Sequence, residues 1–267
     1  ALRFFSEGKW TRGEVLRLPR KTNDLKPFSL LVKCSRPVAP GSPGMWDFPN
    51  PRIRGDRIYA RAHDDLAAVA AIVCVLDEAV RRRVNGDMYA FFTRGEEAGL
   101  VGVTGACKSR TLPKKCVAVA LEASRALPAA PLGGGVVVRV GDLSTVFTPW
   151  VTQLLRQTAD KLVKKDKRFK FQRRLMDGGT CEATAYSAFG YDAGGLCLPL
   201  GNYHNVNRER NRIGAEYIAL SDFECMVKLL DALLRHGDMQ PRNATGFDAY
   251  PLEEQFRDLS SELTRKR

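Results

Sequence analysis

From residue 64 onward, helical hydrophobic patterns alternate with short, almost continuously apolar segments. Three such apolar runs are CVAVALEAS (116–124), GGGVVVRVGD (133–142) and DAGGLCLPL (192–200). Runs of this kind are typical of strands buried on both faces, because helices cover both sides of a parallel sheet. We therefore predict an α/β fold, a three-layer sandwich around a mostly parallel sheet.

The segments between these runs have helical periodicity or turn residues. We expect helices over 64–83, 148–165 and 221–237, the last with Ser221 as N-cap and Gly237 as C-cap. Further expected elements are strands over 87–93 and 169–175, a glycine loop entering a helix over 178–190, and a weak helix over 251–266.

Residues 1–57 differ from the rest of the chain. They are rich in Pro, Arg and Lys, and short strand-like runs such as GEVLRL alternate with turn signals such as APGSPG. We predict a small β-rich module over 1–57 and a larger α/β domain over 58–267.

Composition argues against a membrane span and favours a reducing compartment. The chain has no run of eighteen apolar residues, so we expect no membrane partner. Its seven cysteines are odd in number and widely spaced, and several lie in apolar runs, where a reduced cysteine acts as a small hydrophobe. We therefore expect a cytoplasmic protein.

The formal net charge of +12 raises nucleic acid as a partner. Basic residues gather at 81–83, at the end of a helical pattern, and at 164–174, where Phe169 and Phe171 alternate with them as in an exposed strand. No nucleic-acid-binding motif accompanies either cluster. A solvated basic face is the simpler interpretation, and a nucleic-acid-associated protein is the alternative.

Acidic residues and one late histidine lie where apolar elements begin or end. They are Asp64-Asp65, Glu96-Glu97, Glu122 and His204. Ligands of such sheets collect at the carboxyl ends of the strands, and neighbouring carboxylates repel one another unless a cation lies between them. Oxygen ligands with one imidazole suit zinc, cobalt or manganese, so the sequence indicates metal-dependent hydrolysis.

Each of these features also has a structural interpretation. The first doublet could complement a helix dipole, and the second could be an ordinary solvated turn. Glu122 could form an ion pair, and His204 could be a loop histidine. The segment Gly178-Gly179-Thr180 could be a tight turn, or its backbone N–H groups could hold a substrate carboxylate or carbonyl.

The motifs HDDLA, FTRGEEAGLVG, ALEAS, GGTCEATA and LPLGNYHN occur in this order. The set resembles the zinc-dependent exopeptidases with two co-catalytic metals, which include the tetrahedral and glutamyl aminopeptidases and the carboxypeptidase-G-like amidohydrolases. The resemblance covers Ile58 to Leu230. It implies a hydrolase of the aminopeptidase type, or a deacylase or carboxypeptidase, acting on peptides or N-acyl amino acids. It also implies a homo-oligomer.

The resemblance further implies which residues bind metal. Asp64 would bridge two ions, Glu97 and His204 would complete one site, and Glu122 would bind the other ion. The metal would be zinc, with cobalt or manganese as alternatives, and one or two ions per chain.

Two other positions would serve the reaction itself. Glu96 would be the general base that takes a proton from water and passes it to the leaving amine. Asp65 would follow Asp64 through a strained peptide bond, such as a cis bond, which turns Asp64 inward. Leu66 stands where the family usually has a basic residue, a departure from the pattern.

One ligand that the resemblance implies is missing. The other metal of the family takes a histidine from an H-x-D motif before the inserted β module, whereas this chain has only His63, His204 and His236. We expect no metal ligation by His63, and His236 falls at a helix end. Either residues 1–57 are part of that module and the histidine precedes Ala1, or the chain binds one ion, or it is a degenerate relative that acts as a binding subunit.

Overall fold

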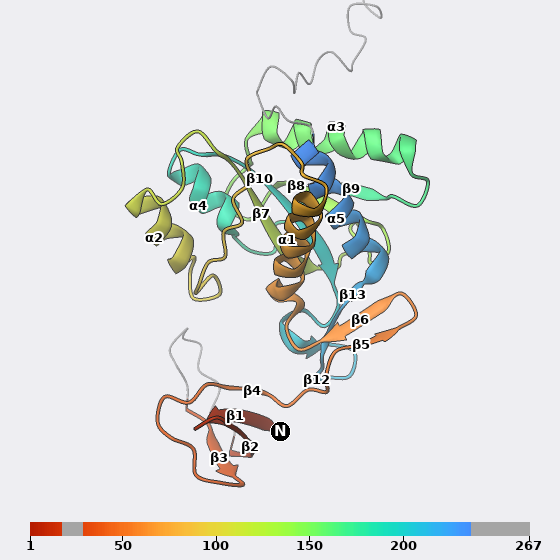
Figure 1. Cartoon of the computed structure of the whole chain (residues 1–267). Helices are drawn as coiled ribbons and strands as arrows, with labels where there is room; N and C mark the ends of the chain where they lie inside the picture. Colours follow the sequence, from red (N-terminus) through yellow and green to blue (C-terminus); the bar gives the residue numbers. More distant parts are fainter. Residues whose placement is uncertain (18–28, 236–267) are drawn as a thin grey trace, which may run out of the picture. The chain divides into compact units, whose positions relative to one another are not determined.

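Two compact units make up the chain, which the computed structural model describes over residues 1–17 and 29–235. The units are Ala1–Arg52 and Ile53–Arg267 (Figure 1). The first is an antiparallel sheet in the order β3-β2-β1-β4, turned between β1 and β2 by Glu7 and Gly8, both with positive φ. Its strands are β1 (Leu2–Ser6), β2 (Lys9–Arg17), β3 (Leu31–Cys34) and β4 (Gly44–Trp46). The predicted β-rich N-terminal sheet is therefore present.

A mixed four-stranded sheet forms the centre of the second unit, in the order β7-β10-β8-β9. The pairs β7/β10 and β8/β9 are parallel, and β10/β8 is antiparallel. The strands are β7 (Val117–Arg125), β8 (Val136–Gly141), β9 (Phe171–Leu175) and β10 (Asp192–Leu200). Each overlaps a segment predicted to be a strand, and the predicted α/β fold is confirmed.

Helices cover both faces of this sheet (Figure 1). Three of them, α1, α3 and α5, share one apolar core with the sheet, and α2 and α4 share another. The bounds are α1 (His63–Arg81), α2 (Val101–Ser109), α3 (Pro149–Lys165), α4 (Glu182–Ala188) and α5 (Leu220–Arg235). The result is the predicted three-layer arrangement.

The residue pattern of the strands decides which helix packs where. In β10, Leu196, Leu198 and Leu200 are buried in the core with α1, α3 and α5. In β7, Ala118 and Ala120 pack in the core with α2 and α4, where their small side chains leave room for close approach. Glu122 follows these two alanines at the same two-residue spacing along β7, so it lies on the α4 face of the sheet.

A smaller sheet, in the order β13-β6-β5, connects the start of α1 with the end of β10. Tyr217 in β13 exchanges backbone hydrogen bonds with Gly201, which directly follows β10, at 2.9 and 3.1 Å. The elements here are β5 (Arg52–Arg54), β6 (Arg57–Ala60), η1 (Tyr203–Asn205), β11 (Val206–Asn207), β12 (Arg212–Ile213) and β13 (Glu216–Ala219).

The predictions of one strand and of one helix cap were wrong. Residues 87–93 form no strand, and Tyr89 and Phe92 remain largely exposed, because a strand also needs a hydrogen-bonded neighbour. Helix α5 starts at Leu220, and Ser221 does not cap it. Instead the carboxylate of Asp56 accepts hydrogen bonds from the Ser221 N–H at 2.9 Å and hydroxyl at 2.6 Å. Helix α2 was not predicted, because two glycines lower the helix propensity of its sequence.

Predictions for Gly237, His236 and residues 251–266 lie outside the described residues. None of the helices in the described part of the chain is both long and apolar enough to cross a bilayer.

The aromatic residues of the basic segment 164–174 belong to the core. Phe169 is only 2% exposed, and Phe171 packs beside it at a ring-centroid distance of 6.5 Å. The prediction of an exposed alternating strand is therefore wrong at these positions, and the segment offers no aromatic surface for stacking bases. The other basic cluster agrees with its prediction, since α1 ends at Arg81, whose guanidinium lies 3.0 Å from Asp77.

Candidate metal centre

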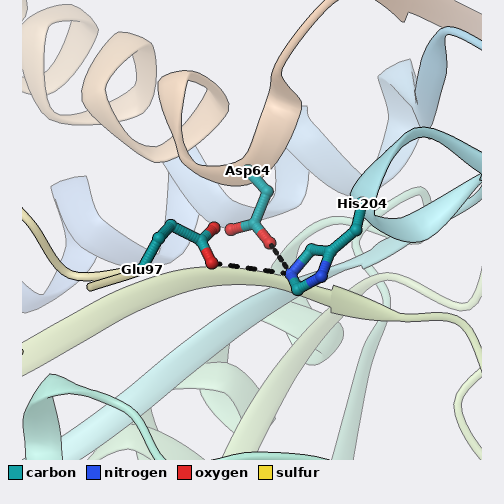
Figure 2. Close-up of side chains that lie close together, drawn as sticks. All are labelled: Asp64, Glu97 and His204. Atoms are coloured by element: carbon teal, nitrogen blue, oxygen red, sulfur yellow. Dashed lines mark ion pairs between the residues drawn. The ribbon is translucent and has the colours of Figure 1, made fainter. Parts of the chain in front are cut away.

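Three side chains from distant segments converge at one point (Figure 2). The Nε2 atom of His204 lies 3.7 Å from Oδ2 of Asp64 and 3.7 Å from Oε2 of Glu97. One ligand atom from each residue fits within 4.8 Å of the others. Ligands about 2.1 Å from a tetrahedral zinc are roughly 3.4 Å apart, so this donor set suits zinc in both spacing and chemistry.

The chain bends sharply where Asp64 enters the site. Asp64 and Asp65 have non-helical backbone angles at the start of α1, and the peptide bond between them is cis, one form of the strained bond that the resemblance implied. The N–H groups of His63 and Asp64 donate to Oε2 of Glu216 at 2.7 and 3.1 Å. The Asp64 backbone is therefore fixed from β13.

A tight turn presents the second doublet. The carbonyl of Glu96 accepts hydrogen bonds from the N–H groups of Gly99 and Leu100, both at 2.9 Å. At Gly102, an added Cβ would lie 2.4 Å from the Arg94 carbonyl oxygen, so only glycine allows α2 to pack this closely against the turn. Glu97 is left exposed at the rim of the site.

A left-handed backbone turns His204 towards the two carboxylates. His204 has φ 54°, and Asn202 and Asn205 beside it also have positive φ. Asparagine and histidine tolerate this region better than most residues, which accounts for their use here. The imidazole stacks on Tyr203 with ring centroids 3.9 Å apart, and this contact fixes the ring plane.

A cavity of about 540 Å³ joins these three residues to other predicted site residues. Its lining includes Glu96, Glu122, Gly178, Gly179 and Thr180, together with Arg139 and Tyr203. Asp65 does not line the cavity and lies deeper, where burial and the charge of Glu122 raise its pKa well above the ordinary value. The structure thus places Asp64, Glu97 and His204 within ligand distance of one another, with Glu96 and Glu122 around the same space.

Burial and mutual repulsion raise the pKa values of these carboxyl groups. The pKa is about 8 for Asp64 and for Glu122, chiefly because both are buried, and about 7 for Glu96, where the charge of Glu97 adds to burial. The raised pKa values show that too little positive charge lies near these carboxyl groups to keep them ionised. A bound divalent cation would supply that charge.

Arg139 is one cation that faces this group, and sequence reasoning missed it. It lies in β8, only 3% exposed, with Nη2 3.4 Å from the Met176 carbonyl oxygen and its guanidinium 5.8 Å from the Phe147 ring centroid. Its charge lowers the pKa of Glu122 against the effect of burial. A single arginine inside the apolar run VVVRVG was the available signal, because a buried charge requires a partner.

The glycine loop is held against the end of β8. Asp142 Oδ2 accepts hydrogen bonds from the Cys181 N–H at 2.9 Å and the Thr184 hydroxyl at 2.6 Å. The Leu143 N–H donates to the Gly179 carbonyl at 3.0 Å. The loop is therefore a fixed turn that also forms one wall of the cavity.

The fold has close counterparts among solved structures. An aminopeptidase from Desulfurococcus kamchatkensis matches with TM-score 0.69 and 19% identity, over 92% of this chain and 71% of that chain. The TET1 peptidase of Pyrococcus horikoshii matches with TM-score 0.69 and 20% identity, over 87% of this chain and 71% of that one. Identities this low show the fold alone.

Sequence comparison agrees. A protein of Acetivibrio thermocellus named "Putative aminopeptidase" is 26% identical over 185 residues, which are 67% of this chain and 51% of that protein. The chain thus spans about half the length of this curated relative. The family model described as M42 glutamyl aminopeptidase matches residues 34–224, well over half of the chain. The resemblance to the co-catalytic zinc exopeptidases is confirmed, and the chain belongs to the M42 glutamyl aminopeptidase family.

Proposed function

We propose that this chain is the catalytic part of a metal-dependent aminopeptidase that hydrolyses peptides at their amino end. The observation that carries the proposal is the convergence of Asp64, Glu97 and His204 at the rim of the cavity. Family membership supplies the reaction class, since the matching model describes glutamyl aminopeptidases.

The donor set fits zinc, with cobalt or manganese as alternatives, because it combines carboxylate oxygens with one imidazole nitrogen. A divalent cation bound there would polarise the scissile carbonyl and acidify a water molecule. Asp64, Glu97 and His204 would hold it. Glu122 lines the same cavity and interacts electrostatically with Asp64, so it would join Asp64 around a second ion.

Glu96 is the residue we assign as general base. It lines the cavity and lies outside the group of three candidate ligands, so its carboxylate remains available for proton transfer. A pKa of about 7 allows it to accept a proton from water near neutral pH and then to donate it to the leaving amine.

Two further assignments concern position. Asp65 would hold the Asp64 backbone in its bent form from a buried place behind the site. Gly178, Gly179 and Thr180 line the cavity, and their backbone N–H groups would bind a substrate carbonyl or carboxylate. His63 takes no part in binding metal in this proposal, since its buried ring bonds to the Ile58 carbonyl at 2.9 Å.

The proposal also covers the oligomeric state of the protein and its compartment in the cell. One similar solved structure is a dodecamer, and the TET1 peptidase of Pyrococcus horikoshii can assemble into a tetrahedron or a large octahedral shell. We propose that this chain also forms a homo-oligomer. All seven cysteines, which lie within the described residues, are free thiols, which supports a reducing cytoplasm. We retain residues 58–267 as the catalytic domain.

The sharpest test compares the two residues of one doublet. Glu96→Gln should retain zinc but lose aminopeptidase activity on aminoacyl p-nitroanilides by about 100-fold or more, whereas Glu97→Gln should lose zinc as well. Metal content by mass spectrometry and initial rates would be measured on the same samples. A Glu96→Gln protein as active as the parent would exclude the assigned mechanism. A parent protein that neither binds zinc nor hydrolyses these substrates would favour a non-catalytic binding subunit.

A further inference from the structure

Glu216 is a buried carboxylate that sequence reasoning did not single out. It begins β13 and is only 3% exposed. No ion pair with a cation is found for it among the described residues, and backbone N–H groups satisfy it instead. Because a buried carboxylate is stable only with hydrogen-bond partners, Glu216 and the backbone segments that donate to it hold one another in place.

The first segment that Glu216 holds is the entry to α1. Its Oε2 atom accepts hydrogen bonds from the N–H groups of His63 at 2.7 Å and Asp64 at 3.1 Å. These donors lie in the non-helical first turn of α1, where no carbonyl of a preceding turn is available to them. The backbone that carries one candidate ligand is therefore fastened directly to β13.

The second segment is the turn that carries His204. The backbone N–H of Asn205, the next residue, lies near enough to the Glu216 carboxylate to lower its pKa. The Asn205 side-chain amide donates to the Arg61 carbonyl at 2.8 Å, so the two segments are joined a second time. The Glu216 carboxylate thus binds the backbone at Asp64, and the Asn205 side chain links the turn that carries His204 to the segment just before Asp64.

The position of β13 makes this arrangement possible. Glu216 lies opposite Ala60 in the antiparallel register with β6, the strand that leads to Asp64. The next residue, Tyr217, bridges to Gly201, which leads to His204. Strand β13 therefore pairs with both the segment that leads to Asp64 and the segment that leads to His204. Glu216, its first residue, lies where these two segments enter the site.

We infer that Glu216 is a positioning residue, which holds Asp64 and His204 at the separation that a zinc ion requires. The inference rests on the proposed function, because it assigns a purpose to contacts between segments that carry candidate ligands. Loss of a residue that orients a metal ligand typically lowers metal affinity about 10- to 100-fold. Glu216→Ala is therefore expected to weaken zinc binding by that factor.

Asp222 offers a matched control. It is also fully buried, and its carboxylate likewise accepts two backbone hydrogen bonds, from Gly133 at 2.8 Å and Gly135 at 2.7 Å. Neither glycine lies beside a candidate metal ligand. Asp222→Ala should thus reduce thermal stability as Glu216→Ala does, but leave zinc affinity unchanged.

The experiment measures the zinc dissociation constant of each folded variant by competition with a chromogenic chelator. Glu216→Gln keeps the side-chain length and one acceptor oxygen, so it should bind zinc more tightly than Glu216→Ala and less tightly than the parent. In the metal-free proteins, amide hydrogen exchange of His63, Asp64 and Asn205 should accelerate together in both Glu216 variants and remain slow in Asp222→Ala.

Each outcome decides the matter. Equal zinc affinity in the parent and the Glu216 variants would overturn the inference and leave the proposed function intact. Equal weakening in Asp222→Ala would also overturn it, by showing that general loosening is the cause. If Glu216→Ala does not fold, the zinc affinity and the amide hydrogen exchange of Glu216→Gln are compared with those of the parent instead. A parent protein that binds no zinc would overturn both the inference and the proposed function.

Discussion

The carboxylate of Asp142 accepts a hydrogen bond from the backbone N–H of Cys181 at 2.9 Å, and so fastens the glycine loop to the end of β8. The same oxygen accepts the Thr184 hydroxyl, and the other oxygen accepts the N–H groups of Ser144 and Thr145 at 2.8 and 3.0 Å. Although burial opposes ionisation, these bonds lower the pKa of Asp142 below its ordinary value. One side chain therefore fixes a wall of the cavity.

Asp142→Ala should loosen that wall. Hydrogen bonds to a charged group contribute about 1.5–3 kcal/mol each, and the donors would be left without an acceptor, so we expect a loss of about 3 kcal/mol in unfolding free energy. The substrate KM should rise more than kcat falls, because Asp142 touches no reacting group. Urea unfolding and steady-state kinetics would check this, with the exposed Asp77→Ala as control. A variant with unchanged KM would contradict it.

Removal of the metal should abolish activity reversibly. Incubation with a chelator should stop hydrolysis, and zinc, cobalt or manganese should restore it, since the donor set accommodates all three. His204→Ala removes a ligand of the candidate site and should weaken zinc binding by more than about 100-fold, beyond the effect of losing an orienting residue. Isothermal titration calorimetry would measure the difference. Full activity in chelator would be decisive against the proposed chemistry.

The metal-free protein should lose stability as pH rises from about 5 to 8. Asp64 and Glu122 have folded-state pKa values of about 8, against ordinary values of 3.8 and 4.5. The folded state therefore binds more protons than the unfolded chain within this window, and the stabilisation is lost as pH rises through the folded pKa. Thermal melts across this range would show it. Zinc should remove the trend, and Glu122→Gln should reduce it; a melting temperature that rises with pH would refute this account.

Arg139→Met should shift the pH–rate profile. The arginine lowers the pKa of Glu96 and Glu122, and methionine keeps much of its apolar volume without the charge. The acidic limb of kcat/KM should therefore move to higher pH, because the general base would hold its proton longer. Arg174→Met, at an exposed position in β9, should leave the profile in place. Identical profiles for parent and Arg139→Met would exclude an electrostatic role for Arg139.

Burial explains which parts of the fold the sequence could predict. The strands β7, β8 and β10 are covered on both faces, so continuous apolar runs such as DAGGLCLPL identify them without further information. The prediction failed at 87–93, where an apolar segment has no partner strand. It also failed at Ser221, because the group that bonds to it, Asp56, comes from a distant segment.

The same distinction holds for the site. The residue types of Asp64, Glu97 and His204 and their places at element ends made them visible in the sequence. Glu216 and Arg139 were missed because their roles depend on contacts made across the sheet and between segments. A chemical group can be predicted from its type and local pattern, whereas the group that orients it requires the tertiary structure.

The closed base of the hairpin after His204 has a use in protein engineering. The Asn205 carbonyl accepts the Gly214 N–H at 2.9 Å, so the chain leaves and rejoins the body of the domain at one point. Between these two residues, β11 and β12 pair with each other, and Val206 and Ile213 are exposed. Segment 206–213 is thus a natural insertion point, where a fluorescent label or an affinity tag can be attached beside the candidate metal centre while the closing pair keeps its ends in register.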